Sequence, residues 1–213
     1  MSKIQKAFEG KKAFIPFITC GDPDLETTEQ LVYAMERAGA SLIELGIPFS
    51  DPTAEGPVIQ GANLRALSGG VTTDKVFDMV VKIRKNSSVP MVFMTYANVV
   101  FSYGTERFIK TAAEIGMDGL ILPDVPYEEK EEFDIVCKKY GIDLISLIAP
   151  TSHERVAQIA HVKKPSFFIL PEKRPAAMVC CPLLYHSGAQ NAIHGRCFDF
   201  SRFSVYARVG SSL

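Results

Sequence analysis

The sequence predicts an α/β fold of the (β/α)8 barrel class, and three observations support this prediction. Apolar runs recur along the chain and are continuous rather than alternating, which is typical of strands buried on both faces of a parallel sheet. Amphipathic helical patterns separate these runs. Residues suited to chemistry, including Glu44, Tyr96 and Asp124, lie at or just after the ends of several runs. Barrel active sites are assembled from such strand ends.

The expected elements alternate in a regular order. Asp22-Pro23-Asp24 supplies a turn and an N-cap before the first long helix, and Gly39, Gly116 and Gly141 stand where helices end. One longer interval between strands holds an acidic loop and an additional helix. This alternation implies a parallel sheet with right-handed crossovers. Strands are expected at residues 13–19, 41–45, 90–94, 119–122, 143–148 and 166–170, and helices at residues 25–38, 58–67, 73–85, 105–115, 127–140 and 153–161.

A doubly wound open sheet would also fit this alternation. No GxGxxG follows the first strand, so the dinucleotide-binding form of the open sheet has no support, and the barrel is favoured. The alternation stops near residue 163, whereas a complete barrel has eight βα units. We expect residues 1–165 to form barrel units one to six of a single domain. Residues 166–213 are expected to form an atypical tail, in which the last units are missing or altered and closure of the domain is incomplete.

Composition excludes several classes of function. The net charge of −1 and the scattered basic residues give no electrostatic support for binding nucleic acid or an anionic membrane. No apolar run is long enough to span a bilayer, and the polar, helix-like start does not resemble a signal peptide. The five cysteines lack CxxC spacing, and neither they nor the four histidines indicate a metal site or a disulfide framework. A cytoplasmic location is therefore expected.

Two acidic residues are candidates for proton transfer. Glu44 lies in an apolar run, and Glu55 lies in the Gly/Pro-rich loop that follows. Burying a carboxylate without a partner is costly, so Glu44 needs a reason to be there. We expect burial to raise the pKa of Glu44, so that the two acids divide the proton traffic. The alternative is one satisfied strand-end acid and one solvated loop acid.

Several long motifs occupy residues 13–23, 44–52, 56–60, 62–67, 94–101 and 123–126. Together they resemble the tryptophan synthase alpha chain family, in the order that the family has, over roughly residues 1–165. The resemblance implies a TIM barrel that acts as a carbon–carbon lyase in tryptophan biosynthesis, cleaving indole-3-glycerol phosphate to indole and glyceraldehyde 3-phosphate. It implies no cofactor in this chain and a pyridoxal-phosphate beta chain as partner in an alpha2-beta2 complex.

The resemblance also assigns residues to the site. The family's catalytic Glu corresponds to Glu44, and its catalytic Asp corresponds to Glu55, whose side chain is one methylene longer. A displacement of about 1 Å in a catalytic group can lower the rate on the order of a hundredfold. Phe17 and Tyr96 are expected to wall the indole pocket. The alternative for Phe17 is plain core packing, and the alternative for Tyr96 is a buried tyrosine with a hydrogen-bonded hydroxyl group. Asp22 and Asp124 are expected to shape loops rather than to catalyse.

The family's glycine-rich phosphate motifs are absent after residue 165, where Pro171-Glu172-Lys173-Arg174 stands instead. One hypothesis is that the tail is an out-of-frame reading, which sequencing the encoding DNA in three frames would test. If no other frame restores the glycine motifs, this hypothesis fails. Two rival interpretations of the chain also remain: an inactive alpha-like chain that only binds and activates a beta chain, and a product too incomplete to fold, since open sheet edges favour aggregation.

Overall fold

The computed structural model describes residues 2–8, 13–53, 55–148 and 166–169. Within them a parallel sheet of six strands runs in the order β1-β2-β3-β4-β5-β6, and each strand pairs in parallel with the next one in the sequence. This order is the one a (β/α)8 barrel requires of its first six strands. The strands are β1 Phe17–Thr19, β2 Ile43–Gly46, β3 Met91–Met94, β4 Gly119–Ile121, β5 Asp143–Ile148 and β6 Ser166–Ile169.

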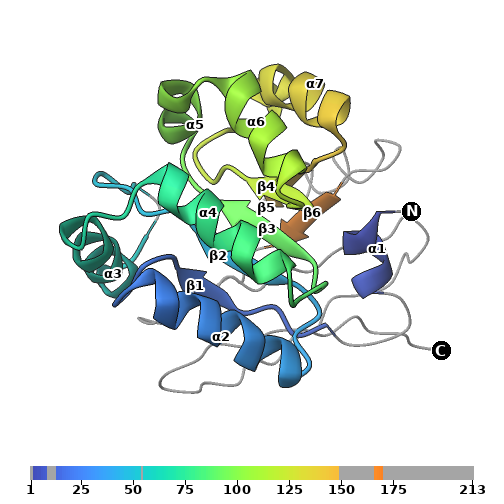
Figure 1. Cartoon of the computed structure of the whole chain (residues 1–213). Coiled ribbons are helices and arrows are strands. Elements are labelled where there is room, and N and C mark those ends of the chain that lie inside the picture. Colours follow the sequence, from blue (N-terminus) through green and yellow to red (C-terminus); the bar gives the residue numbers. More distant parts are fainter. Residues whose placement is uncertain (1, 9–12, 54, 149–165, 170–213) are drawn as a thin grey trace.

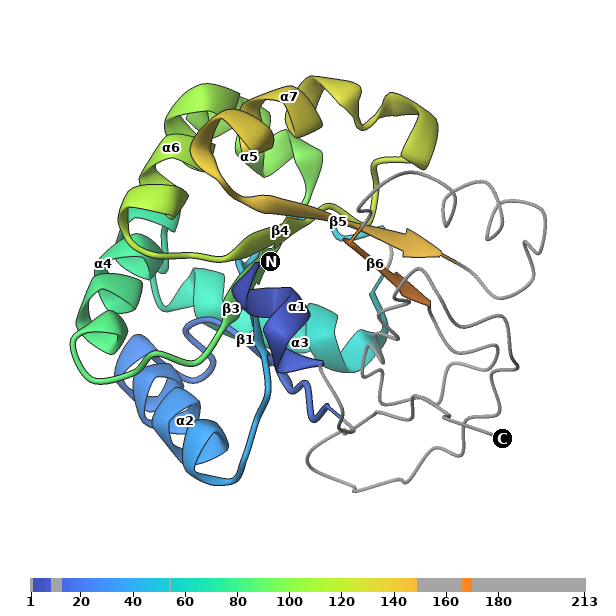
Figure 2. The ribbon, with the colours of Figure 1, turned by 90° about the vertical axis from the view of Figure 1, so that its right-hand side faces the viewer.

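The helices lie on one side of the sheet and at its two ends. Four helices, α2, α4, α6 and α7, cover the outer side of the sheet (Figure 1). Helices α3 and α5 follow the carboxyl ends of β2 and β3, and α1 lies at the opposite end of the strands (Figures 1 and 2). The bounds are α1 Lys3–Ala7, α2 Leu25–Arg37, α3 Pro57–Ser68, α4 Thr73–Arg84, α5 Ala97–Tyr103, α6 Thr105–Glu114, the 3-10 turn Tyr127–Glu129 and α7 Glu131–Tyr140.

All six predicted strands are present, and most differ from the prediction only at their ends. The first is shorter than expected: pairing starts at Phe17, because Pro16 has no N–H to donate to a ladder. The Pro16 carbonyl still accepts a hydrogen bond from the Glu44 amide at 2.9 Å. The expected helix at 153–161 lies outside the described residues. The division of the chain at residue 165 stays a prediction for the same reason.

Two apolar clusters cover the two faces of the sheet. The outer cluster lies between the sheet and the four helices and includes Ile43, Leu45 and Phe93. The inner cluster lies on the opposite face and includes Val92 and Ile121. Alternate residues of one strand thus enter different clusters, as the two-residue repeat of a strand requires. Both faces are buried, which explains why the strands read as continuous apolar runs.

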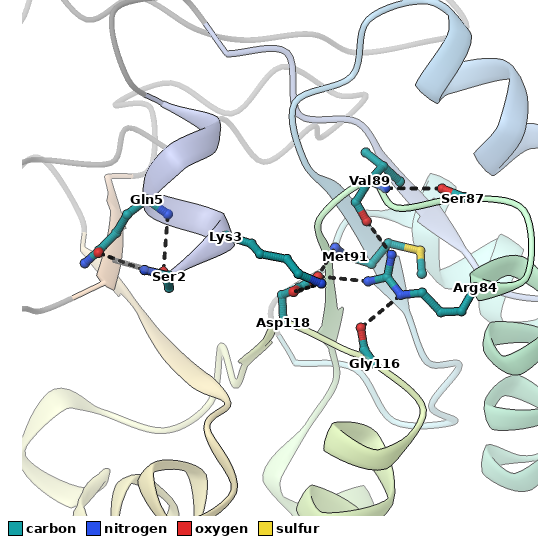
Figure 3. A network of polar contacts seen from close by, with 9 residues as sticks. All are labelled: Ser2, Lys3, Gln5, Arg84, Ser87, Val89, Met91, Gly116 and Asp118. Carbon is teal, nitrogen blue, oxygen red and sulfur yellow. Dashed lines mark hydrogen bonds and ion pairs between the residues drawn. The ribbon is translucent and has the colours of Figure 1, made fainter.

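Helix α1 covers the amino ends of the strands. Ser2 and the Gln5 side chain form a reciprocal cap, with Ser2 N donating to Gln5 Oε1 at 3.1 Å and Gln5 N donating to Ser2 Oγ at 3.3 Å (Figure 3). Ile4, on the same helix, is fully buried in the inner cluster. The helix therefore covers the inner cluster at the amino ends of the strands.

A charged network ties the amino ends of β3 and β4 together. Asp118 Oδ2 accepts hydrogen bonds from Arg84 Nη2 at 2.8 Å and from the Met91 amide at 3.0 Å (Figure 3). Arg84 Nε also donates to the Gly116 carbonyl at 2.9 Å, and Lys3 Nζ lies 3.3 Å from Asp118 Oδ1. Both Asp118 and Arg84 are largely buried and fully partnered, so the network holds α4, β3 and β4 in one geometry.

In the part of the chain that the structure describes, no helix has the length and apolar character that crossing a bilayer would need.

Candidate active site

Strand β2 carries Glu44 into the inner face of the sheet. Its neighbours Ile43 and Leu45 belong to the outer cluster, so Glu44 points the other way. The register places Glu44 beside Phe17 of β1 and Val92 of β3. Val92 belongs to the inner cluster and Phe17 packs against it. Glu44 is thus a carboxyl group surrounded by apolar side chains.

Burial sets the electrostatics of Glu44. The residue is 0% exposed, and neither of its carboxyl oxygens has a hydrogen-bond partner among the described residues. Loss of hydration disfavours the charged form and raises the pKa of Glu44 to about 8. The group is therefore protonated at neutral pH, and it can donate or accept a proton at a pH close to neutral. Burying a carboxyl group without a partner costs free energy of folding. Titratable groups with such a perturbed pKa cluster at functional sites.

Gly46 gives the Phe17 ring its place beside β2. A Cβ atom at Gly46 would lie 2.6 Å from Phe17 Cζ, so only glycine leaves room for the ring. Gly46 is two residues beyond Glu44 and on the same face of the strand. Phe17 therefore lies along the inner face close to the carboxyl group, where an aromatic ring can form the wall of an apolar pocket.

Glu55 lies in the loop between β2 and α3. Helix α3 begins immediately after it, with Gly56 at the N-cap and Pro57 at the first helical position. The Asn63 side chain donates a hydrogen bond from Nδ2 to Glu55 Oε2 at 2.7 Å. Partial burial raises the pKa of Glu55, while hydrogen bonds from Asn63 and Tyr96 act in the opposite direction. The carboxyl group is thus half-buried but partnered, in contrast to Glu44.

Tyr96 joins this loop to the next strand. It is the N-cap residue of α5 and is 3% exposed, and its ring centroid lies 5.1 Å from that of Phe49. Both carboxylate oxygens of Asp124 accept the Ala97 amide at 3.1 Å and so hold the start of α5. Glu44 lies within β2, whereas Glu55 and Tyr96 follow the carboxyl ends of the neighbouring strands β2 and β3.

Comparison with known proteins identifies the family of the chain. The sequence model of the family described as tryptophan synthase alpha chain matches residues 3–170. The chain belongs to this family. A tryptophan synthase alpha chain from Lacticaseibacillus casei is 52% identical over 169 residues, which are 79% of this chain and 63% of that protein. This chain therefore spans less than two thirds of the length of that relative.

Solved structures of the tryptophan synthase alpha chain confirm the predicted fold class. The alpha subunit from Legionella pneumophila str. Paris has a TM-score of 0.75 at 40% identity and covers 81% of this chain and 68% of its own. A structure described as the tryptophan synthase α2β2 complex from Pyrococcus furiosus has a TM-score of 0.70 at 36% identity. That match covers 74% of this chain and 64% of the other. The described residues accordingly have the architecture of the first six strands of a (β/α)8 barrel.

The structure places two of the residues expected to shape loops in that role. Asp22 accepts two hydrogen bonds from Arg65, at 2.8 Å from Nε and 2.7 Å from Nη2, and so ties the loop after β1 to helix α3. Asp124 holds the start of α5, as described above. Through these hydrogen bonds both carboxylates fix loops that follow strands.

Asn63 was not predicted from the sequence. A signal for it exists in helix α3, because the buried positions Ile59, Ala62, Asn63 and Ala66 follow helical spacing and only one of them is polar. A polar residue on a buried stripe needs a partner, and Glu55 is that partner. The two residues are eight positions apart, and their contact depends on how the loop folds back onto the helix.

No group of three or more His, Cys, Asp or Glu residues that could hold a metal ion occurs within the described ranges. Cys20 and Cys137 are free, buried thiols there, and burial raises the pKa of each. Both therefore belong to the core rather than to the chemistry of the site.

Proposed function

We propose that this chain is a carbon–carbon lyase that cleaves indole-3-glycerol phosphate to indole and glyceraldehyde 3-phosphate. The observation that carries the proposal is Glu44, a fully buried carboxyl group on the inner face of β2 without a partner among the described residues. The loop that carries Glu55 follows the carboxyl end of the same strand, and barrel active sites are built at those ends. Membership of the tryptophan synthase alpha chain family supports the same reaction.

The proposed reaction moves one proton within the substrate. Glu44 in its neutral form donates a proton to C3 of the indole ring, and the carboxylate that results takes the proton of the adjacent glycerol hydroxyl group. The carbon–carbon bond then breaks, its electron pair returns to the indole ring, and the hydroxyl carbon becomes the aldehyde of glyceraldehyde 3-phosphate. Glu44 ends the cycle protonated, as it began.

Glu55 has a different proposed role. In its ionised form it accepts the indole N–H and stabilises the positive charge that develops on the ring when C3 is protonated. Hydrogen bonds from Asn63 and Tyr96 favour this ionised form. Phe17 and Tyr96 would supply the aromatic walls of the indole pocket. Glu44 and Glu55 are thus the proposed catalytic residues, with no metal among their requirements.

The proposed partner is a tryptophan synthase beta chain in an alpha2-beta2 complex, and the Pyrococcus furiosus complex supports it. Pyridoxal phosphate would belong to that beta chain, and no cofactor is required of this chain for the reaction proposed. We also propose a cytoplasmic location, which the family supports.

The test is release of glyceraldehyde 3-phosphate from indole-3-glycerol phosphate, measured with and without a beta chain. We expect Glu44→Gln to lower turnover by roughly a hundredfold to ten-thousandfold, because general acid–base catalysis contributes about that much. Glu114→Gln makes the same chemical change on an exposed side chain of α6 and should leave turnover unchanged. Equal turnover in Glu44→Gln and the unchanged chain would refute the proposed role.

A second function is favoured by one observation. The glycine-rich phosphate motifs of the family are absent from the sequence, so the chain could bind and activate a beta chain without cleaving substrate. In the same assay this function predicts no glyceraldehyde 3-phosphate from any preparation. It also predicts stimulation of the beta-chain reaction by both the unchanged chain and Glu44→Gln.

A further inference from the structure

Asn63 is a buried polar residue whose amide serves one group. It is 4% exposed and lies on the buried stripe of α3. Its Nδ2 donates to Glu55 Oε2 at 2.7 Å, which is the short distance expected when the acceptor is charged. A buried amide costs free energy unless it is hydrogen-bonded, so its geometry is set by the group it meets.

Helix α3 holds both the main chain and the side chain of Glu55. Gln60, one turn before Asn63, donates from Nε2 to the Glu55 carbonyl at 2.9 Å. Asn63 holds the carboxyl group, and the Tyr96 hydroxyl hydrogen-bonds to the same carboxyl group from the start of α5. Glu55 lies outside any helix or strand, yet residues of α3 and the first turn of α5 hold it in place.

We propose that Asn63 is a positioning residue for the lyase reaction: its amide holds the longer side chain of Glu55 so that the carboxylate meets the indole N–H of the substrate in one orientation. This inference rests on the proposed function. Glutamate has one more rotatable bond than aspartate, and each additional rotamer lowers the fraction of molecules whose carboxylate has the reactive orientation. The hydrogen bond from Asn63 removes that freedom, and holding a reacting group in one orientation lowers the barrier of the step.

The hydrogen bond from Asn63 also acts on protonation. A donor to a carboxylate favours the ionised form, which is the form that can accept the indole N–H. Burial acts in the opposite direction and raises the pKa of Glu55. Asn63 therefore offsets part of the effect of burial at the residue that must carry charge in the proposed reaction.

The first test follows the protonation of Glu55 by carbon-13 NMR in the full chain labelled with [13C]glutamate, with the signal assigned through Glu55→Gln. We expect Asn63→Leu to raise the pKa of Glu55, because it removes a donor while keeping a similar volume. Leu64→Ala changes an exposed neighbour on the same helix and should leave that pKa unchanged. An unmoved pKa in folded Asn63→Leu would overturn the proposal. The measurement needs no turnover, so it is independent of the proposed function.

The second test exchanges the lengths of the two side chains. Asn63→Leu should lower kcat roughly tenfold with KM changed by less than about twofold, since orientation rather than substrate binding is lost. Glu55→Asp should show a similar loss, and Glu55→Asp combined with Asn63→Gln should restore part of it by rebuilding the contact. Additive losses in the double variant would overturn the positioning role. A chain without turnover, in which the pKa of Glu55 still depends on Asn63, would refute the proposed function alone.

Discussion

Two carboxyl groups, one before strand β4 and one within strand β2, have opposite surroundings. Before β4, the largely buried Asp118 meets Arg84, the Met91 amide and Lys3, so its oxygens are partnered (Figure 3). Within β2, Glu44 is more deeply buried and has no partner among the described residues. The first arrangement stabilises the fold, and the second costs free energy that only a function explains.

This difference separates a contact that stabilises the fold from a buried group for which we propose a catalytic role. In a barrel, residues at the amino ends of strands serve the fold, whereas residues at the carboxyl ends serve the reaction. Asp143 is a partial exception at the amino end, because its Oδ2 atom has no partner in the described part and burial raises its pKa. The contrast is therefore sharpest between Asp118 and Glu44, which the following predictions compare.

The largest effect on stability is expected from Asp118→Ala. Removing this carboxylate leaves the largely buried Arg84 guanidinium without its counter-charge and the Met91 amide without its acceptor. We expect the free energy of unfolding to fall by about 4 kcal/mol, measured by urea denaturation. Turnover per folded molecule should not change. A loss of turnover in the folded fraction would show that Asp118 also affects the reaction and not the stability alone.

Glu44→Gln should stabilise the fold in a pH-dependent way. Burial raises the pKa of Glu44 from its ordinary 4.5 to about 8, so the folded chain binds this proton more tightly than the unfolded chain does. Its contribution to stability is complete below about pH 4.5 and is lost as the pH rises through about 8. We therefore expect Glu44→Gln to exceed the unchanged chain in the free energy of unfolding by up to about 4 kcal/mol at pH 8 and to match it near pH 4.

Urea denaturation across this pH range measures the difference, with Glu114→Gln as the matched control on the surface. A constant difference between Glu44→Gln and the unchanged chain at every pH would show that packing, and not the charge of Glu44, is responsible.

The smallest effect is expected from Lys3→Ala. Lys3 lies 3.3 Å from Asp118, but its side chain is 63% exposed, so water screens the pair. We expect a loss of less than about 1 kcal/mol in the same denaturation experiment. A loss as large as that of Asp118→Ala would mean that α1 is held chiefly by this ion pair and not by Ile4.

Much of the fold could be predicted from the sequence, because strands buried on both faces leave continuous apolar runs. Helix α5 could not. Its N-cap residue, Tyr96, makes no side-chain hydrogen bond to the helix, so the usual local start signal is missing. The acceptor for its first amide is Asp124, which lies after the next strand. A start signal supplied from that distance is invisible to a search for local patterns.

The candidate site could be predicted in part. Glu44 stood out because a carboxyl group in an apolar run contradicts its surroundings, and the structure places it in the inner face. The catalytic roles of Glu44 and Glu55 and the binding roles of Phe17 and Tyr96 remain predictions. The contact between Glu55 and Asn63 was not predicted, because it depends on how one loop folds back onto the helix that follows it.

The close approach of Phe17 to Gly46 limits the order in which these two positions can change during evolution. A methyl group at position 46 collides with the ring, whereas a smaller side chain at position 17 meets no such obstacle. Lineages or libraries should therefore fix a replacement of Phe17 before any replacement of Gly46. The reverse order passes through an intermediate in which two groups occupy one space.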